Sequence, residues 1–178
     1  VRLEYAGEIA EMDAAPVTRA FLAGLLRDVS ARVNVVNAFL IAEERGIEVT
    51  ASYKHASGEF APAIRSHVVG VGGEHTVSGA LFGQNEGRIT EIDGFRIEAI
   101  PAGHMLLMHN KDVPGVIGRV GTILGESGVN ISRFHLGRRE RGGEAVAVIE
   151  TDAPIGAETI DALRSFEHVI STRQIELR

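Results

Sequence analysis

The chain has 178 residues and a formal net charge of −6 at pH 7, with 44% hydrophobic and 24% charged residues, the balance of a folded globular protein. It contains no cysteine, which excludes disulfides, thiolate zinc sites and a cysteine nucleophile. The negative charge argues against nucleic acid as a partner, and no apolar run approaches the roughly 20 residues that cross a bilayer. We therefore expect a cytoplasmic protein without nucleic-acid or membrane partners.

The chain begins on Val1 to Tyr5, which alternate apolar and charged residues without an initiator Met, so we expect a piece of a longer protein. A strand over residues 1–8 precedes a helix whose first turn holds Pro16. Its apolar stripe at helical spacing consists of Leu22, Leu25, Leu26, Val29 and Val33. A second helix over residues 38–45 is ended by Gly46.

A two-residue period then predicts strands, with tight turns at Gly72-Gly73 and Asp93-Gly94. The strands cover residues 47–54, 64–71, 75–82, 88–92 and 95–100. The first domain, residues 1–102, is therefore predicted to contain helices followed by an antiparallel meander.

Residues 103–178 predict a second small domain with the order β-α-β-β-α-β, a four-stranded antiparallel sheet with two helices on one face. The strands cover residues 104–110, 131–136, 144–150 and 169–177. The first helix opens at Pro114-Gly115, stops at Gly128 and buries Val116, Val120, Ile123 and Leu124. The second buries Ile160 and Leu163. The fold class is therefore α+β, with two domains.

The turn from the first strand of this second domain into its first helix has the elements of an amino-acid site. Amide groups at a helix start attract a carboxylate, and Gly115 lets a ligand approach the backbone closely. Asp112 can accept a hydrogen bond from an ammonium group, and Asn130 can both donate and accept. The alternative is that Asp112 only caps the helix and Asn130 only orders a turn.

Two resemblances to known families support the interpretation as an amino-acid site. The motif Asn110-x-Asp112-x-Pro114-Gly115-Val116, with Gly128-Val129-Asn130-Ile131, resembles the ACT domain, a regulatory module of amino-acid-pathway enzymes. Residues 35–38, 42–46 and 77–83 resemble the allosteric substrate-binding domain of long-form D-3-phosphoglycerate dehydrogenases. The tandem implies the carboxyl-terminal regulatory part of such a dehydrogenase, in which two ACT domains associate side by side and bind L-serine across their interface as feedback inhibitor.

The resemblance also implies site residues. It assigns Asp112 and Asn130 to serine contacts, with Asn110 and the amides near Gly115 beside them. In the first domain it implies a site for phosphate or the phosphorylated substrate. The basic side chains proposed for that site are Arg88, Arg65 and Arg96, and the alternative for each is an exposed strand arginine paired with a carboxylate.

No catalytic set is visible in the sequence. The seven histidines lack metal-ligand spacing, so no metal site is expected. No nucleophile elbow, dinucleotide fingerprint or phosphate-binding loop is present. We therefore expect no enzyme activity and no cofactor in this fragment, with NAD bound by the missing part of the parent. Two alternatives are a companion regulatory subunit of a serine dehydratase and an oligomerisation module without a ligand.

Overall fold

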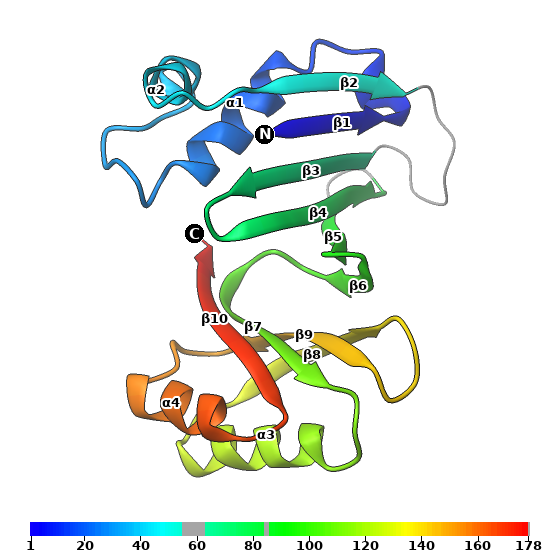
Figure 1. Ribbon diagram of the computed structural model, residues 1–178, viewed down its shortest axis with the longest axis vertical. Coiled ribbons are helices and arrows are strands. Elements are labelled where there is room, and N and C mark those ends of the chain that lie inside the picture. Colours follow the sequence, from blue (N-terminus) through cyan, green and yellow to red (C-terminus); the bar gives the residue numbers. More distant parts are fainter. Residues whose placement is uncertain (55–62, 84–85, 178) are drawn as a thin grey trace. The chain divides into compact units, whose positions relative to one another are not determined.

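The computed structural model describes residues 1–54, 63–83 and 86–177 (Figure 1). Its contacts divide the chain into two compact units, Val1–Gly87 and Arg88–Arg178. This division lies some way before residues 102 and 103, where the sequence suggested a domain boundary, and that boundary stays a prediction.

Among its described residues, the first unit combines two helices, a short 3-10 helix and four strands. The strands and helices in chain order are β1 (Arg2–Ala6), η1 (Gly7–Ala10), α1 (Ala15–Leu25), α2 (Ala38–Glu44), β2 (Thr50–Lys54), β3 (Ala63–Gly70) and β4 (Gly73–Phe82). Each predicted helix and strand of this stretch is present, although β2 begins only at Thr50 rather than at residue 47.

The sheet of this unit is not a simple meander. Its strands lie in the order β2-β1-β3-β4, so β1 is inserted between β2 and β3 (Figure 1). The pairing of β1 with β2 is parallel, whereas β1 with β3 and β3 with β4 are antiparallel. The expected antiparallel meander is therefore confirmed for β3 and β4 and wrong for β2, which pairs with β1 rather than with β3. A parallel pair needs a long crossover, and α1 and α2 lie in the chain segment that supplies it.

The helices of the first unit bury a narrower stripe than their sequence suggested. Leu22 and Leu26 pack with Ala38 and Ala42 of α2 in one apolar cluster. Leu25, by contrast, is 37% exposed and Val29 is 50% exposed. Val29 comes after α1, which ends at Leu25, so the helical spacing no longer places its side chain on the buried stripe.

The second unit contains the predicted β-α-β-β-α-β order, preceded by a hairpin. The hairpin strands are β5 (Glu86–Ile92), which enters this unit at Arg88, and β6 (Phe95–Ala99). The rest follow as β7 (Gly103–Lys111), α3 (Val116–Glu126), β8 (Ile131–Arg138), β9 (Glu144–Thr151), α4 (Ala157–Ser165) and β10 (Val169–Leu177). The last four strands form a sheet in the order β10-β7-β9-β8, in which every neighbouring pair is antiparallel. The predicted α+β class is confirmed.

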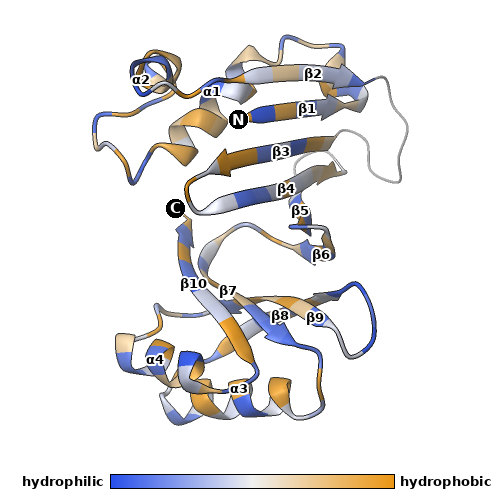
Figure 2. Ribbon diagram, in the orientation of Figure 1, coloured by the Kyte–Doolittle hydropathy of each residue, from blue (hydrophilic) through white to orange (hydrophobic). Residues whose placement is uncertain are grey.

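Both faces of this sheet are covered within the unit. On one face, α3 buries the predicted stripe against the strands, and both α3 and α4 lie on this side (Figures 1 and 2). On the other face, Phe95 and Ile97 of the β5–β6 hairpin pack against Val146 and Val148 of β9. Across the described parts of the chain, no helix is long and apolar enough to span a membrane.

Candidate functional site

Asp112 lies directly after β7 and ties this strand end to the β8–β9 hairpin. Its Oδ2 accepts hydrogen bonds from Nη1 of Arg138 at 2.9 Å and from the amide of Gly142 at 3.2 Å. Its own amide donates to the carbonyl of Gly143 at 2.8 Å. The Arg138 guanidinium and, after it, the Gly142 amide lower the pKa of the Asp112 carboxyl below its ordinary value. The carboxylate is therefore an anion at neutral pH.

A hollow of about 630 Å³ opens beside this carboxylate. Its lining includes Asp112, Gly115 and Ile117 from the start of α3, and Arg138 and Arg141 from the hairpin. Gly115, the residue before α3, has a φ of 92°, in the left-handed region that glycine adopts without strain. The amides of the first helical turn have no partner within the helix and carry its partial positive charge. One hollow thus offers a carboxylate, cationic side chains and helix-start amides.

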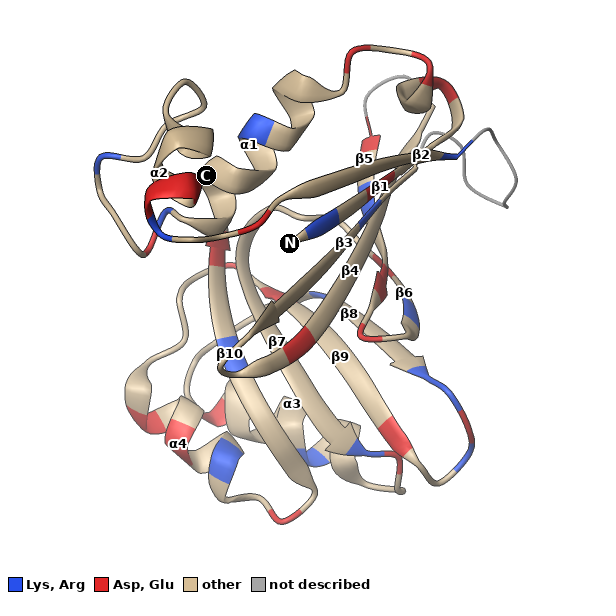
Figure 3. Cartoon of the chain, turned by 45° about the horizontal axis from the view of Figure 1, so that its top comes forward, with Lys and Arg blue, Asp and Glu red and all other residues tan. Residues whose placement is uncertain are grey.

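The arginines of the hairpin tip, Arg138, Arg139 and Arg141, are exposed, and the first two also make contacts within the second unit. Figure 3 shows the tip between β8 and β9 with basic segments around an acidic one. Arg138 binds Asp112, and the guanidinium of Arg139 lies 4.5 Å from the ring centroid of Phe95. Arg139 also donates to the carbonyl groups of Asp93 and Gly94. The pairing of Lys111 with Glu144 puts the tip next to Asp112, and no pattern in the sequence shows this pairing.

Asn110 is buried near the end of β7, with 2% of its surface exposed. Its Nδ2 donates to the carbonyl of Lys111 at 2.8 Å. Its Oδ1 is buried and has no hydrogen-bond partner among the described residues. Asn110 therefore has an unused acceptor two residues before Asp112. Leaving a buried acceptor without a partner costs about 1–3 kcal/mol.

Asn130 lies at the opposite end of the same sheet. Ile131, the next residue, is opposite Thr151 at the end of β9, whereas Lys111, just before Asp112, is opposite Glu144 at its start. The length of β9 between those pairs is roughly 24 Å at about 3.4 Å per residue. The exposed Asn130 side chain donates to Oδ2 of Asp152 at 2.7 Å. The structure therefore brings Asn110, Asp112 and Gly115 to one end of a copy and Asn130 to the other.

The three arginines predicted to bind an anion fall in different units. Arg65 is on β3 of the first unit, where its Nε donates to Oγ of Ser78 at 3.0 Å. Arg88 and Arg96 belong to the β5–β6 hairpin of the second unit. The Nε of Arg88 lies 4.0 Å from a carboxylate oxygen of Glu98, and Arg96 lies opposite Glu91. Arginines paired with strand carboxylates were the alternative expected for this set, and the anion site stays a prediction.

No group of three or more His, Asp or Glu side chains that could hold a metal ion is present in residues 1–54, 63–83 and 86–177.

Comparison with known proteins assigns both parts of the chain. Residues 1–93 match the family model of the D-3-phosphoglycerate dehydrogenase intervening domain, and residues 104–168 match the ACT domain. A solved ACT domain from the GTP pyrophosphokinase of Chlorobium tepidum aligns with 42% of this chain at 13% identity and a TM-score of 0.34.

The relatives found by sequence are longer proteins. The D-3-phosphoglycerate dehydrogenases of Bacillus subtilis and Methanocaldococcus jannaschii are each 34% identical over 99% of this chain, which covers 34% of their length. The enzyme of Synechocystis is 36% identical over 84% of this chain and 27% of its own length. The chain thus spans about a third of these relatives. It belongs to the D-3-phosphoglycerate dehydrogenase intervening-domain family and carries an ACT domain after that domain.

Proposed function

We propose that the chain is the regulatory part of a D-3-phosphoglycerate dehydrogenase and that it binds L-serine between the ACT domains of two copies. The supporting observation is the separation of Asp112 and Asn130 by the length of β9 within one copy. A small amino acid cannot span roughly 24 Å, so a site that uses both residues needs two copies.

The free edge of the ACT sheet offers a way to build such a site. β8 is an edge strand, and an edge strand presents unpaired backbone groups to another chain. Antiparallel pairing of β8 with β8 of a second copy about a two-fold axis sets Ile131 opposite Arg138 of that copy. Asn130 precedes Ile131, and Arg138 binds Asp112. This pairing therefore brings Asn130 of one copy to the Asp112 hollow of the other.

The groups collected in this way match a zwitterion. The amides at the start of α3 and the guanidinium of Arg141 suit the ligand's carboxylate. Oδ2 of Asp112 takes both hydrogen bonds from the hairpin, which leaves Oδ1 for the ammonium group. Asn130 of the second copy, and the unused Oδ1 of Asn110, suit the ligand's remaining polar groups.

Regulation follows if serine binds one arrangement of the parent protein more tightly than another. Such a coupling is typically about 1–3 kcal/mol, and it requires no catalytic group in this region. The parent would oxidise 3-phosphoglycerate with NAD in the cytoplasm, and serine, the end product of that pathway, would inhibit it. The predicted anion site near Arg88, with Arg65 and Arg96, would take phosphate or the phosphorylated substrate.

Calorimetry of the chain with L-serine tests the proposal. We expect saturable heat from the unmodified chain and none from Asp112→Ala at the same concentrations. The matched control is Asp161→Ala, because Asp161 also pairs with an arginine, Arg164 at 3.4 Å, but on the exposed surface of α4. Absence of heat from the unmodified chain at millimolar serine, or equal binding by Asp112→Ala, would contradict the proposal.

A further inference from the structure

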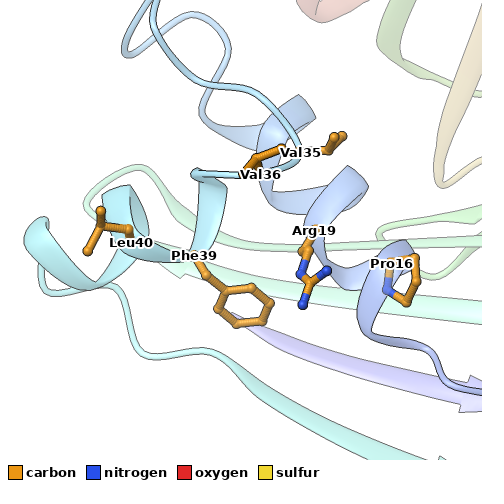
Figure 4. A pocket seen from close by; sticks show the side chains of 6 residues that line it. All are labelled: Pro16, Arg19, Val35, Val36, Phe39 and Leu40. Carbon is orange, nitrogen blue, oxygen red and sulfur yellow. The ribbon is translucent and has the colours of Figure 1, made fainter.

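The helical face of the first unit exposes a group of large apolar side chains. Val36 is 86% exposed, Leu40 57%, Val35 53% and Phe39 41%. Together with Pro16 and Arg19 they line an open hollow of about 740 Å³ between α1, α2 and the loop that connects these two helices (Figure 4). Scattered exposed apolar residues need no explanation, but a contiguous group of this kind marks an interaction surface.

Phe39 separates this hollow from a second one. The second hollow, of about 350 Å³, is lined by Phe39 together with Ala42, Glu43, Ile47 and Val49. Phe39 lines both hollows, and Figure 4 shows its ring beside the guanidinium of Arg19 in the first. Phe39 therefore stands between a mainly apolar depression and a smaller one whose lining is mixed in polarity.

The two depressions carry opposite charges. Arg19 lines the first and Glu43 lines the second, and both residues are exposed. Neither side chain makes an ion pair or hydrogen bond with any residue that the structure describes. Among the described residues, the surface thus has an unpaired cation, Arg19, on one side of Phe39 and an unpaired anion, Glu43, on the other. The same surface on a second copy would offer each of them a partner of opposite charge.

We infer that this face, made of Arg19, Val35, Val36, Phe39, Leu40 and Glu43, binds the same face of a second copy of the chain. A two-fold axis beside Phe39 exchanges the two hollows, so that Arg19 of each copy meets Glu43 of the other. The apolar residues supply the buried surface, and the two ion pairs at the rim fix the register and select the partner. This contact is separate from the pairing of ACT domains and does not depend on serine.

Charge inversion tests the pairing in the full chain, with molar mass measured by light scattering after size-exclusion chromatography. Arg19→Glu alone and Glu43→Arg alone each place like charges opposite one another in both pairs. We expect each variant to show about half the molar mass of the unmodified chain. An equimolar mixture of the two restores opposite charges at both pairs, so we expect it to regain the full mass.

Two further inversions serve as controls. Glu11→Arg and Arg27→Glu change charge at residues that line neither hollow, and we expect them to keep the full mass. Circular dichroism establishes that each variant is folded. If the single variants keep the full mass, or if the mixture stays at half, the inferred contact is wrong. Failure of serine binding leaves this readout unchanged, because the mass ratio does not depend on what the ACT domain binds.

Discussion

Glu150 of β9 provides a sharp stability test, because it is a carboxylate buried inside the second unit, called the ACT unit below because it contains the ACT domain. Only 7% of its side chain is exposed. One oxygen, Oε2, accepts a hydrogen bond from Nη1 of Arg133 at 2.8 Å. The other, Oε1, lies 3.5 Å from Nε2 of His135 and has no hydrogen-bond partner in the described part of the chain. Arg133→Ala would therefore leave a buried charge without its main partner.

The size of the effect follows from the burial of the two partners. Removing one member of a fully buried pair costs about 3–5 kcal/mol. The Arg133 side chain is 51% exposed, so water replaces part of what it supplies. We expect Arg133→Ala to lower the free energy of unfolding by about 1–3 kcal/mol. Glu150→Gln keeps the shape and removes the charge, so the double variant Arg133→Ala/Glu150→Gln should be more stable than Arg133→Ala alone.

Urea denaturation at neutral pH measures these free energies. Asp161→Ala, which breaks the exposed pair with Arg164, is the control, and its effect should stay within about 0.5 kcal/mol. The reasoning is refuted if Arg133→Ala is as stable as the unmodified chain. It is also refuted if the double variant is less stable than Arg133→Ala.

Two further predictions concern the ACT unit. Gly137→Ala should lower the free energy of unfolding by about 1–3 kcal/mol, because a Cβ at this position would meet the backbone carbonyl of Arg96. Gly125→Ala in α3 is the control: its Cβ would meet nothing within 4 Å, so it should be neutral or stabilising. Thermal denaturation compares the two variants. Because the pKa of Asp112 is lowered in the folded chain, its carboxylate should add stability above its unfolded pKa, and this stability is lost as pH falls through the folded value. The difference in free energy of unfolding between the unmodified chain and Asp112→Asn should therefore shrink under acidic conditions. Urea denaturation across pH measures this difference, and a pH-independent difference would contradict the assignment.

Local sequence patterns predicted most of the ACT unit correctly because its elements are regular. Val116, Val120, Ile123 and Leu124 occur at helical spacing, and all four are buried. Gly128 ends the helix with a φ of 73°, as a capping glycine should. Such features depend on residues close together in the chain, which periodicity reports directly.

Features that depend on distant pairing were not predictable in the same way. The alternation of residues 1–8 and 47–54 predicts strands but does not say that β1 and β2 are parallel neighbours. Likewise, the composition of the hairpin tip indicates a charged turn. That Arg138 binds Asp112, 26 positions away, depends on how β7 and β9 pair.

The candidate site residues were chosen by residue type, and their positions along the sheet could not be predicted. Asn110, Asp112 and Gly115 do lie at one end of the ACT sheet, and Asn130 lies at the other. The resemblance implies a serine site between two ACT domains, but the sequence does not show how far apart Asp112 and Asn130 lie within one copy. That distance follows only once the register along β9 is known.

Mixing two binding-deficient variants tests the two-copy site most directly. In Asp112→Ala and in Asn130→Ala, every proposed site lacks one contact, so neither should bind L-serine. After unfolding and refolding together at equal amounts, half of the pairs are mixed, and each mixed pair keeps one site with both Asp112 and Asn130 intact. Calorimetry should then find about one quarter of the unmodified number of sites per chain. Serine binding by either variant alone, or no binding by the refolded mixture, would contradict the account.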